Sequence, residues 1–132
     1  MTQETKFVVV EGLGRLPQFS HATIAGEWIH VSGTLGTLRD SMNLAAGGTG
    51  PETTQTLRNM GSILEACGAG FANVVKVSVF LKDMGTFAAM NEAYGSFFPG
   101  EPPARITVGV ADLALGAAVE IECVARLASS SS

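Results

Sequence analysis

The sequence predicts an α+β fold in which two helices cover one face of a mixed β-sheet. Six short segments are β-branched or alternate between apolar and polar side chains, as strands do, and two segments repeat apolar residues at helical steps. The chain of 132 residues has the length of one domain. We assign residues 1–128 to this domain and expect the serine tail, residues 129–132, to be disordered.

The N-terminal part of the chain is predicted to form three strands. Residues 6–10, Lys-Phe-Val-Val-Val, are β-branched and are followed by turn-prone residues. Residues 21–25 and 27–32 flank Gly26 and are expected to pair as a hairpin. Residues 33–50 contain five glycines and show little hydrophobic period, so we expect a long loop of the kind that is often functional.

The first helix is predicted to begin near Pro51 and to end at Gly68. Proline at an early position and the acidic Glu52 are typical of a first helical turn, and glycine is typical of a helix C-terminus. One apolar face follows from the three- and four-residue spacing of Leu57, Met60, Leu64 and Cys67.

The second half of the chain is predicted to form a strand, a helix and two more strands. The strand is residues 73–82, and Asp83 can cap the helix that follows. Residues 105–111 and 118–127 are the last two strands. Alternation places Val75, Val77, Val79 and Leu81 on one face of the first strand, and the helical period aligns Phe87, Met90, Tyr94 and Phe97.

Composition argues against several classes of protein. Eight Lys and Arg against twelve Asp and Glu give a net charge of -4, and the absence of a basic run argues against nucleic-acid binding. No apolar stretch approaches the roughly 20 residues of a membrane-spanning helix. Residues 1–6 hold no apolar signal segment, so we expect a cytoplasmic protein.

Self-association is expected, whereas a metal site and a disulfide are not. Charged residues make up only 15% of the chain, and a second copy is one way to cover the uncharged surface and the sheet face without helices. Cys67 and Cys123 form no CxxC motif and are expected to be buried thiols. His21 and His30 lack the spacing of metal ligands.

The last two strands carry the most informative polar pattern. Arg105 and Thr107 alternate with an apolar stripe, and Glu120 and Glu122 alternate with another. Two interpretations stay open: ion pairs between neighbouring strands that face solvent, or a site in which arginine binds a carboxylate and glutamate activates water. Gly33 could likewise present a backbone N–H to a ligand or simply end a strand.

Five segments, taken in order, resemble those of a known family. Residues 103–108, Pro-Ala-Arg-Ile-Thr-Val, and 119–125, Val-Glu-Ile-Glu-Cys-Val-Ala, resemble the paired C-terminal signature of the Rid/YjgF-like reactive-intermediate deaminases. The resemblance extends to the family's early strand, first helix, central strand and second helix, at residues 29–33, 54–59, 75–83 and 90–98.

The resemblance implies a chorismate-mutase-like homotrimer with pockets at the subunit interfaces. It implies a metabolite damage-control enzyme that hydrolyses 2-enamine and 2-imine acids, such as 2-aminoacrylate and 2-iminopropanoate, to 2-oxo acids and ammonia without a cofactor. By this resemblance Arg105 holds the substrate carboxylate and Glu120 orients the attacking water. Ser32, Gly33 and Asn91 line the pocket, with Asn91 contributed by the neighbouring subunit.

Two expected substrate-binding positions depart from the family pattern. Phe19 stands where a tyrosine is usual and lacks its hydroxyl, and Thr107 stands where a cysteine is common. Two alternatives therefore stay open: a specialised member that acts on another pathway intermediate, and a non-catalytic trimer that binds small carboxylates. A ribonuclease function is sometimes attached to this family, but this sequence has no basic patch that would bind RNA.

Overall fold

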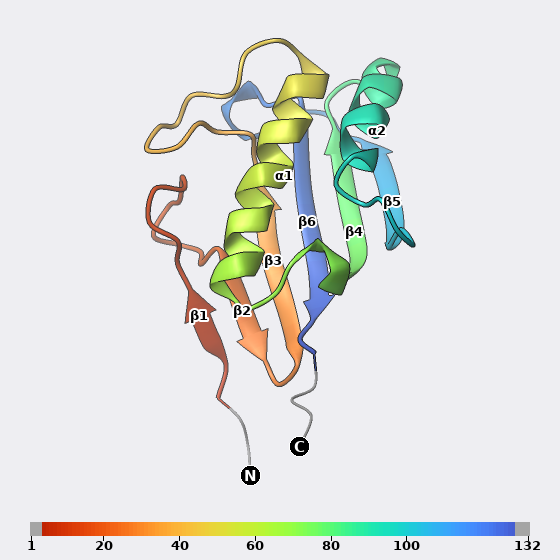
Figure 1. Ribbon diagram of the computed structural model, residues 1–132. Helices are drawn as coiled ribbons and strands as arrows, with labels where there is room; N and C mark the ends of the chain where they lie inside the picture. Colours follow the sequence, from red (N-terminus) through yellow and green to blue (C-terminus); the bar gives the residue numbers. More distant parts are fainter. Residues whose placement is uncertain (1–3, 129–132) are drawn as a thin grey trace.

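The computed structural model describes residues 4–128, and its elements follow the predicted order (Figure 1). The predicted serine tail at residues 129–132 lies outside the described residues. The strands and helices are β1 (Lys6–Val8), β2 (Ala22–Ala25), β3 (Trp28–Thr34), α1 (Thr49–Ala66), β4 (Val74–Leu81), α2 (Phe87–Gly95), β5 (Ala104–Gly109) and β6 (Val119–Arg126). Short 3₁₀ turns η1 (Phe71–Asn73), η2 (Met84–Thr86) and η3 (Ala114–Gly116) precede β4, α2 and β6.

The six strands form one mixed sheet in the order β1-β2-β3-β6-β4-β5. Strands β4 and β5 run parallel, and the other neighbouring pairs run antiparallel. Both helices lie on the same face, α1 across β3 and β6 and α2 beside it near β4 (Figure 1). The predicted α+β arrangement is therefore confirmed.

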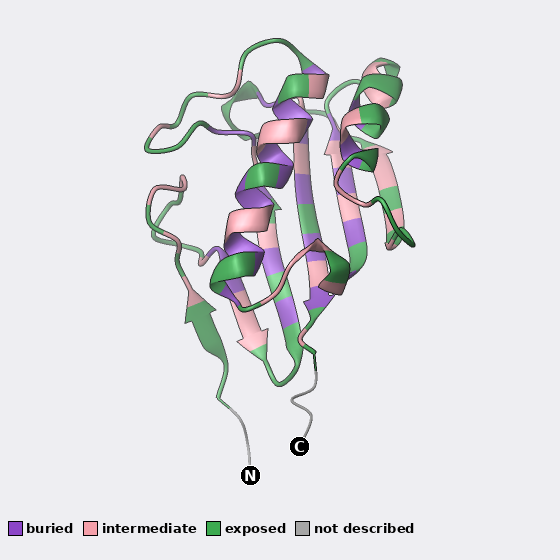
Figure 2. Cartoon of the chain, in the orientation of Figure 1, coloured by how far each residue is buried: buried purple, intermediate pink, exposed green. Residues whose placement is uncertain are grey.

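The core lies between the helices and the sheet, where buried residues alternate along β6 (Figure 2). Leu57, Met60 and Leu64 of α1 are fully buried against this face, as their spacing predicts. Cys67 and Cys123 are buried free thiols, also as predicted. Burial raises the pKa of the Cys67 thiol and raises that of Cys123 to about 12. Neither thiol is therefore poised as a nucleophile.

Two details of β4 and α2 differ from the prediction. Val75 is exposed, because the register against β6 shifts between Val74 and Lys76 and places Val74 in the core instead. Asp83 caps the turn η2 and not α2: its carboxylate accepts the N–H of Gly85 at 2.8 Å, and the helix begins only at Phe87. Alternation thus fails where a register shift interrupts it.

The glycine-rich loop is shorter than predicted and spans residues 35–48. Strand β3 continues through Gly33, and α1 begins at Thr49. Glu52, in the first turn of α1, is buried and accepts the N–H of Ala118 at 2.8 Å. This bond ties the start of α1 to the start of β6, which carries Glu120.

The face of the sheet opposite the helices exposes large apolar side chains among polar ones such as His30 and Glu122. Phe7, Trp28 and Ile106 lie on it and are 71%, 40% and 49% exposed. Such a face is typical of a surface that another molecule covers. Separately, no helix within residues 4–128 combines the length and the apolar character needed to cross a membrane.

Candidate functional site

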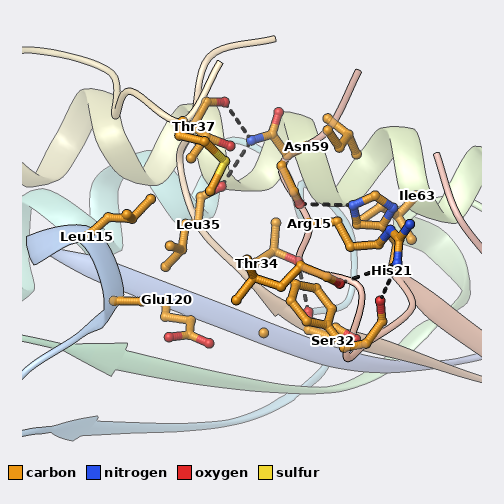
Figure 3. Close-up of a pocket in the computed structure, with 17 residues that line it drawn as sticks. Arg15, His21, Ser32, Thr34, Leu35, Thr37, Asn59, Ile63, Leu115 and Glu120 are labelled. Carbon is orange, nitrogen blue, oxygen red and sulfur yellow. Dashed lines mark hydrogen bonds between the residues drawn. The ribbon is translucent and has the colours of Figure 1, made fainter. Parts of the chain in front are cut away.

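A cavity of about 280 Å³ opens at the end of β3, where residues 13–21 and the loop 35–48 meet α1 (Figure 3). Four predicted site residues line it: Phe19, Ser32, Gly33 and Glu120. We call these four residues the Glu120 cluster. Much of the remaining wall is apolar and consists of Leu13, Leu16, Leu35, Met42, Ile63, Ala114 and Leu115.

Glu120 is the ionisable group of this cavity with a perturbed pKa. Burial, and secondly the negative charge of Glu122, raise the pKa of the Glu120 carboxyl above its ordinary value. Among residues 4–128, Glu120 forms no ion pair and no side-chain hydrogen bond. A partly desolvated and unpartnered carboxylate beside a cavity can accept a proton from a bound water.

The backbone at Gly33 makes room for the carboxylate. The register of β3 against β6 shifts between Val31 and Thr34, which places Gly33 directly beside Glu120. A Cβ atom built on Gly33 collides with Glu120 Oε2. A side chain at this position would therefore force the Glu120 carboxylate to move, and this effect arises from space and not from a positive φ angle.

We expect Gly33→Ala to displace the Glu120 carboxylate and lower activity at least about tenfold, because a misplaced catalytic group loses its attack geometry. The fold should survive, since Gly33 is exposed at a strand end. Steady-state kinetics together with thermal unfolding check this. Gly100→Ala is a suitable control, because a Cβ atom there meets nothing within 4 Å. Full activity of a folded Gly33→Ala protein would contradict the placement of Glu120.

The segment that carries Phe19 is held by hydrogen bonds that the sequence does not reveal. His21 is buried; its Nδ1 accepts the N–H of Val10 at 2.9 Å, so Nε2 carries the proton and donates to the carbonyl of Gly14 at 3.1 Å. Arg15 donates to the carbonyl of Phe19 at 3.1 Å. His21 is thus a structural anchor of the cavity wall in its neutral form.

Arg105 lies elsewhere, on the edge strand β5. Its guanidinium stacks over the ring of Tyr94 at 4.7 Å and approaches that of Phe87 at 5.6 Å. Its Nη1 donates to Oδ1 of Asn91 at 2.8 Å. Two aromatic rings and one amide therefore fix the orientation of the guanidinium. We call Asn91, Arg105 and Thr107 the Arg105 cluster.

The predicted arrangement of Arg105 and Glu120 on one polar face of neighbouring strands is wrong. Strand β4 lies between β5 and β6. Arg105 pairs with Val77, a core residue under the helices, whereas Glu120 pairs with Phe80, whose side chain points to the opposite face. The Arg105 cluster and the Glu120 cluster are consequently separated within one chain.

Two buried hydroxyl groups near Arg105, that of Tyr94 and Oγ1 of Thr107, have no hydrogen-bond partner within residues 4–128. An unsatisfied buried polar atom is costly and calls for an explanation, such as a bound ligand or water. Burial also raises the pKa of Tyr94, so its hydroxyl stays protonated and able to donate. The sequence signalled Tyr94 only as part of an apolar helix face.

Asn59 is a further residue whose role the sequence pattern did not indicate. Its amide nitrogen donates to the carbonyls of Leu35 and Thr37, both at 2.9 Å, and so holds the loop 35–48 against α1. The sequence offered one indication of this role: Asn59 is a polar residue between the apolar positions Leu57 and Met60 of the predicted helix. Among residues 4–128, no three or more His, Cys, Asp or Glu side chains are grouped so that they could hold a metal ion.

Comparisons with known proteins agree with the fold. The family model described as Endoribonuclease L-PSP matches residues 13–127. The chain is 41% identical to human 2-iminobutanoate/2-iminopropanoate deaminase over 85% of this chain and 82% of that protein. It is 40% identical to chloroplastic Reactive Intermediate Deaminase A of Arabidopsis thaliana over 85% of this chain, but spans only 60% of that protein.

Solved structures show the same architecture. Yeast Mmf1 superposes with a TM-score of 0.90 at 31% identity, covering 95% of this chain and 100% of that one. The YjgF gene product of E. coli superposes with a TM-score of 0.84 at 29% identity, covering 92% of this chain and 98% of that one.

Proposed function

This chain belongs to the Endoribonuclease L-PSP family, the family of YjgF and the Rid deaminases, and on that premise we propose that it hydrolyses 2-enamine and 2-imine acids to 2-oxo acids and ammonia. The observation that carries the proposal is the unpartnered Glu120 carboxylate, with its raised pKa, beside the cavity. Relatives about 40% identical carry names that state this activity for 2-iminobutanoate and 2-iminopropanoate.

The chemistry requires one water and one group that moves protons. With the imine protonated on nitrogen, ionised Glu120 accepts a proton from the water as the water oxygen bonds to C2, and the π electrons of the C2–N bond become the lone pair of an amine. Glu120 then gives this proton to the amine nitrogen and takes the hydroxyl proton as the C2–N bond breaks, so that the C=O bond of the 2-oxo acid forms and ammonia leaves. A carboxyl whose pKa is raised towards neutrality serves both steps.

We propose that Arg105 binds the substrate carboxylate and that the site forms between copies of the chain. The Arg105 cluster and the Glu120 cluster lie on opposite faces of one sheet, so a small substrate that contacts both must lie between two molecules. The exposed apolar side chains of the helix-free face favour such an assembly. The homotrimeric state comes from the family resemblance.

We expect a solution mass near three times 13.6 kDa, the mass of one chain. The physical reason is that association removes the exposed apolar side chains of the helix-free face from water. Light scattering at micromolar concentration measures this directly. A monomer at that concentration would contradict the proposed shared site.

An ammonia-release assay tests the activity. An amino-acid oxidase generates imines in place from several amino acids, and the rate of ammonia formation is compared with uncatalysed hydrolysis in the same buffer. Acceleration by the protein is expected, and Glu120→Gln serves as the control for contaminating enzymes. No acceleration of any imine would favour the non-catalytic alternative, a trimer that binds small carboxylates.

We further propose a cytoplasmic damage-control role that needs no cofactor, metal, nucleic acid or membrane. An imine carbon is already electrophilic, so correct placement of water supplies much of the catalysis. Phe19 favours a second candidate, a member specialised for another pathway intermediate, because it offers the substrate an apolar ring in place of a hydroxyl.

A further inference from the structure

We propose that the cavity beside Glu120 holds the substrate side chain and selects imines with long apolar or aromatic side chains, such as those derived from leucine, methionine and phenylalanine. The proposal rests on the proposed deaminase function and adds the substrate class. Three features of the cavity support it: its lining, its position relative to Glu120, and its size.

The lining offers little polar recognition, because four of its polar side chains are already engaged with the backbone. Nε2 of His21 bonds the carbonyl of Gly14, and Ser32 Oγ donates to the carbonyl of Ser20 at 2.6 Å. Thr34 Oγ1 and Asn59 Nδ2 likewise donate to backbone carbonyls, at 2.8 and 2.9 Å. The surface left for a ligand is mainly the apolar wall, and removing hydrocarbon from water against this wall makes binding more favourable.

The cavity is continuous with the reactive group. Gly33 and Glu120 line it together with Ile63 of α1, so it extends from the end of β3 towards α1 (Figure 3). When C2 of an imine lies beside Glu120, the substituent on C2 has this hollow next to it. Leu16, Met42 and Leu115 line the same cavity and are 58%, 51% and 51% exposed in the single chain, so they are apolar surface that a substrate side chain can contact.

The size fits a side chain better than a large ligand. The cavity of about 280 Å³ is below the roughly 300–1,000 Å³ of sites that enclose drug-sized molecules. Each buried methylene contributes about 0.8 kcal/mol, or about fourfold in binding. Leucine-derived imine carries three more carbons than the alanine-derived one, so we expect a preference of at least about tenfold in kcat/KM.

The test compares kcat/KM for imines generated from leucine, methionine, phenylalanine and alanine. Leu35→Trp should fill the cavity and lower the leucine-to-alanine ratio about tenfold. Met42→Trp is the second filling variant if Leu35→Trp does not fold, since Met42 is exposed at the rim. Leu38→Trp is the matched control: Leu38 lies in the same loop and is 44% exposed, but does not line the cavity, so the ratio should stay unchanged.

Binding measurements separate this proposal from the deaminase function. Calorimetric titration should show tighter binding of 4-methyl-2-oxopentanoate than of 2-oxopropanoate, and Leu35→Trp or Met42→Trp should remove the difference. If no imine is hydrolysed but this binding preference holds, the deaminase function fails and the apolar pocket stands. Equal affinity for both acids, or an equal effect of Met42→Trp and Leu38→Trp on the ratio, would overturn the pocket.

Discussion

Glu120→Gln should lower turnover of imine hydrolysis by about 10²- to 10⁴-fold while a carboxylate ligand still binds. This is the range that a positioned acid–base group contributes, and glutamine keeps the shape but cannot accept the proton. A group needed only in the transition state changes kcat and not ground-state binding. Steady-state kinetics and calorimetric titration of 2-oxobutanoate measure the two effects separately. Equal losses of affinity and turnover would show that Glu120 holds the substrate instead.

The pH dependence of activity provides a second test of the role of Glu120. Activity that needs ionised Glu120 falls as the pH drops through its pKa, which burial and Glu122 raise above the ordinary value. Glu122→Gln is the matched control, two residues along the same face of β6. It should keep the activity plateau and shift the acid limb to lower pH, because one source of the raised pKa is removed.

Stability should change in the opposite direction from activity. Because the pKa of Glu120 is raised in the folded protein, its stabilising contribution belongs to the protonated form and is lost as the pH rises through that pKa. Glu120→Gln should therefore unfold at a higher temperature than the parent protein at pH 7. The difference should vanish below the ordinary pKa of glutamate, which thermal unfolding at several pH values can measure.

Arg105→Ala should weaken binding of a small 2-oxo acid by about ten- to a hundredfold. A charge-assisted hydrogen bond contributes roughly 1.5–3 kcal/mol, and about 1.4 kcal/mol corresponds to a factor of ten. Arg105→Lys should recover only part of the affinity, because lysine cannot form the planar two-bond contact and stacks less well on Tyr94. Titration of 2-oxobutanoate into each protein measures the effect.

Arg126 provides a matched control for Arg105. It too lies over an aromatic ring, that of Trp28 at 5.8 Å, and it pairs with Glu27 at 2.9 Å. Arg126→Ala should leave the ligand affinity of the folded, oligomeric protein unchanged, because Arg126 lines neither the cavity nor the Arg105 cluster. If folded, oligomeric Arg105→Ala retained full affinity, Arg105 would be a surface residue of the same kind.

The order of the elements followed from local pattern, but the faces of the outer strand did not. Along β5, Arg105 alternates with Ile106, and the apolar residue is the natural choice for the core. The structure reverses this assignment: Arg105 lies under α2 on aromatic rings, and Ile106 is exposed. The alternation of polar and apolar residues along a strand shows only that its two faces differ. Which face the helices cover follows from the pairing of β5 with its neighbour β4.

The candidate site shows the same limit. The polar alternation of the last two strands singled out Arg105 and Glu120, and the family resemblance supplied their roles. Their separation within one chain depends on the strand order, which no local pattern contains. His21 was visible only as a histidine without metal-ligand spacing. Its role depends on backbone groups at Val10 and Gly14 that approach it only after the segment has folded.

The placement of Arg105 and Glu120 on opposite faces of one sheet has a genetic consequence. Under the proposed shared site, each allele contributes its arginine to one interface and its carboxylate to another. Two inactive alleles, one lacking Arg105 and one lacking Glu120, would therefore complement each other in one cell, because a mixed assembly contains an interface with both groups intact. Compensating changes at the two positions would likewise be inherited together in one gene while acting between molecules.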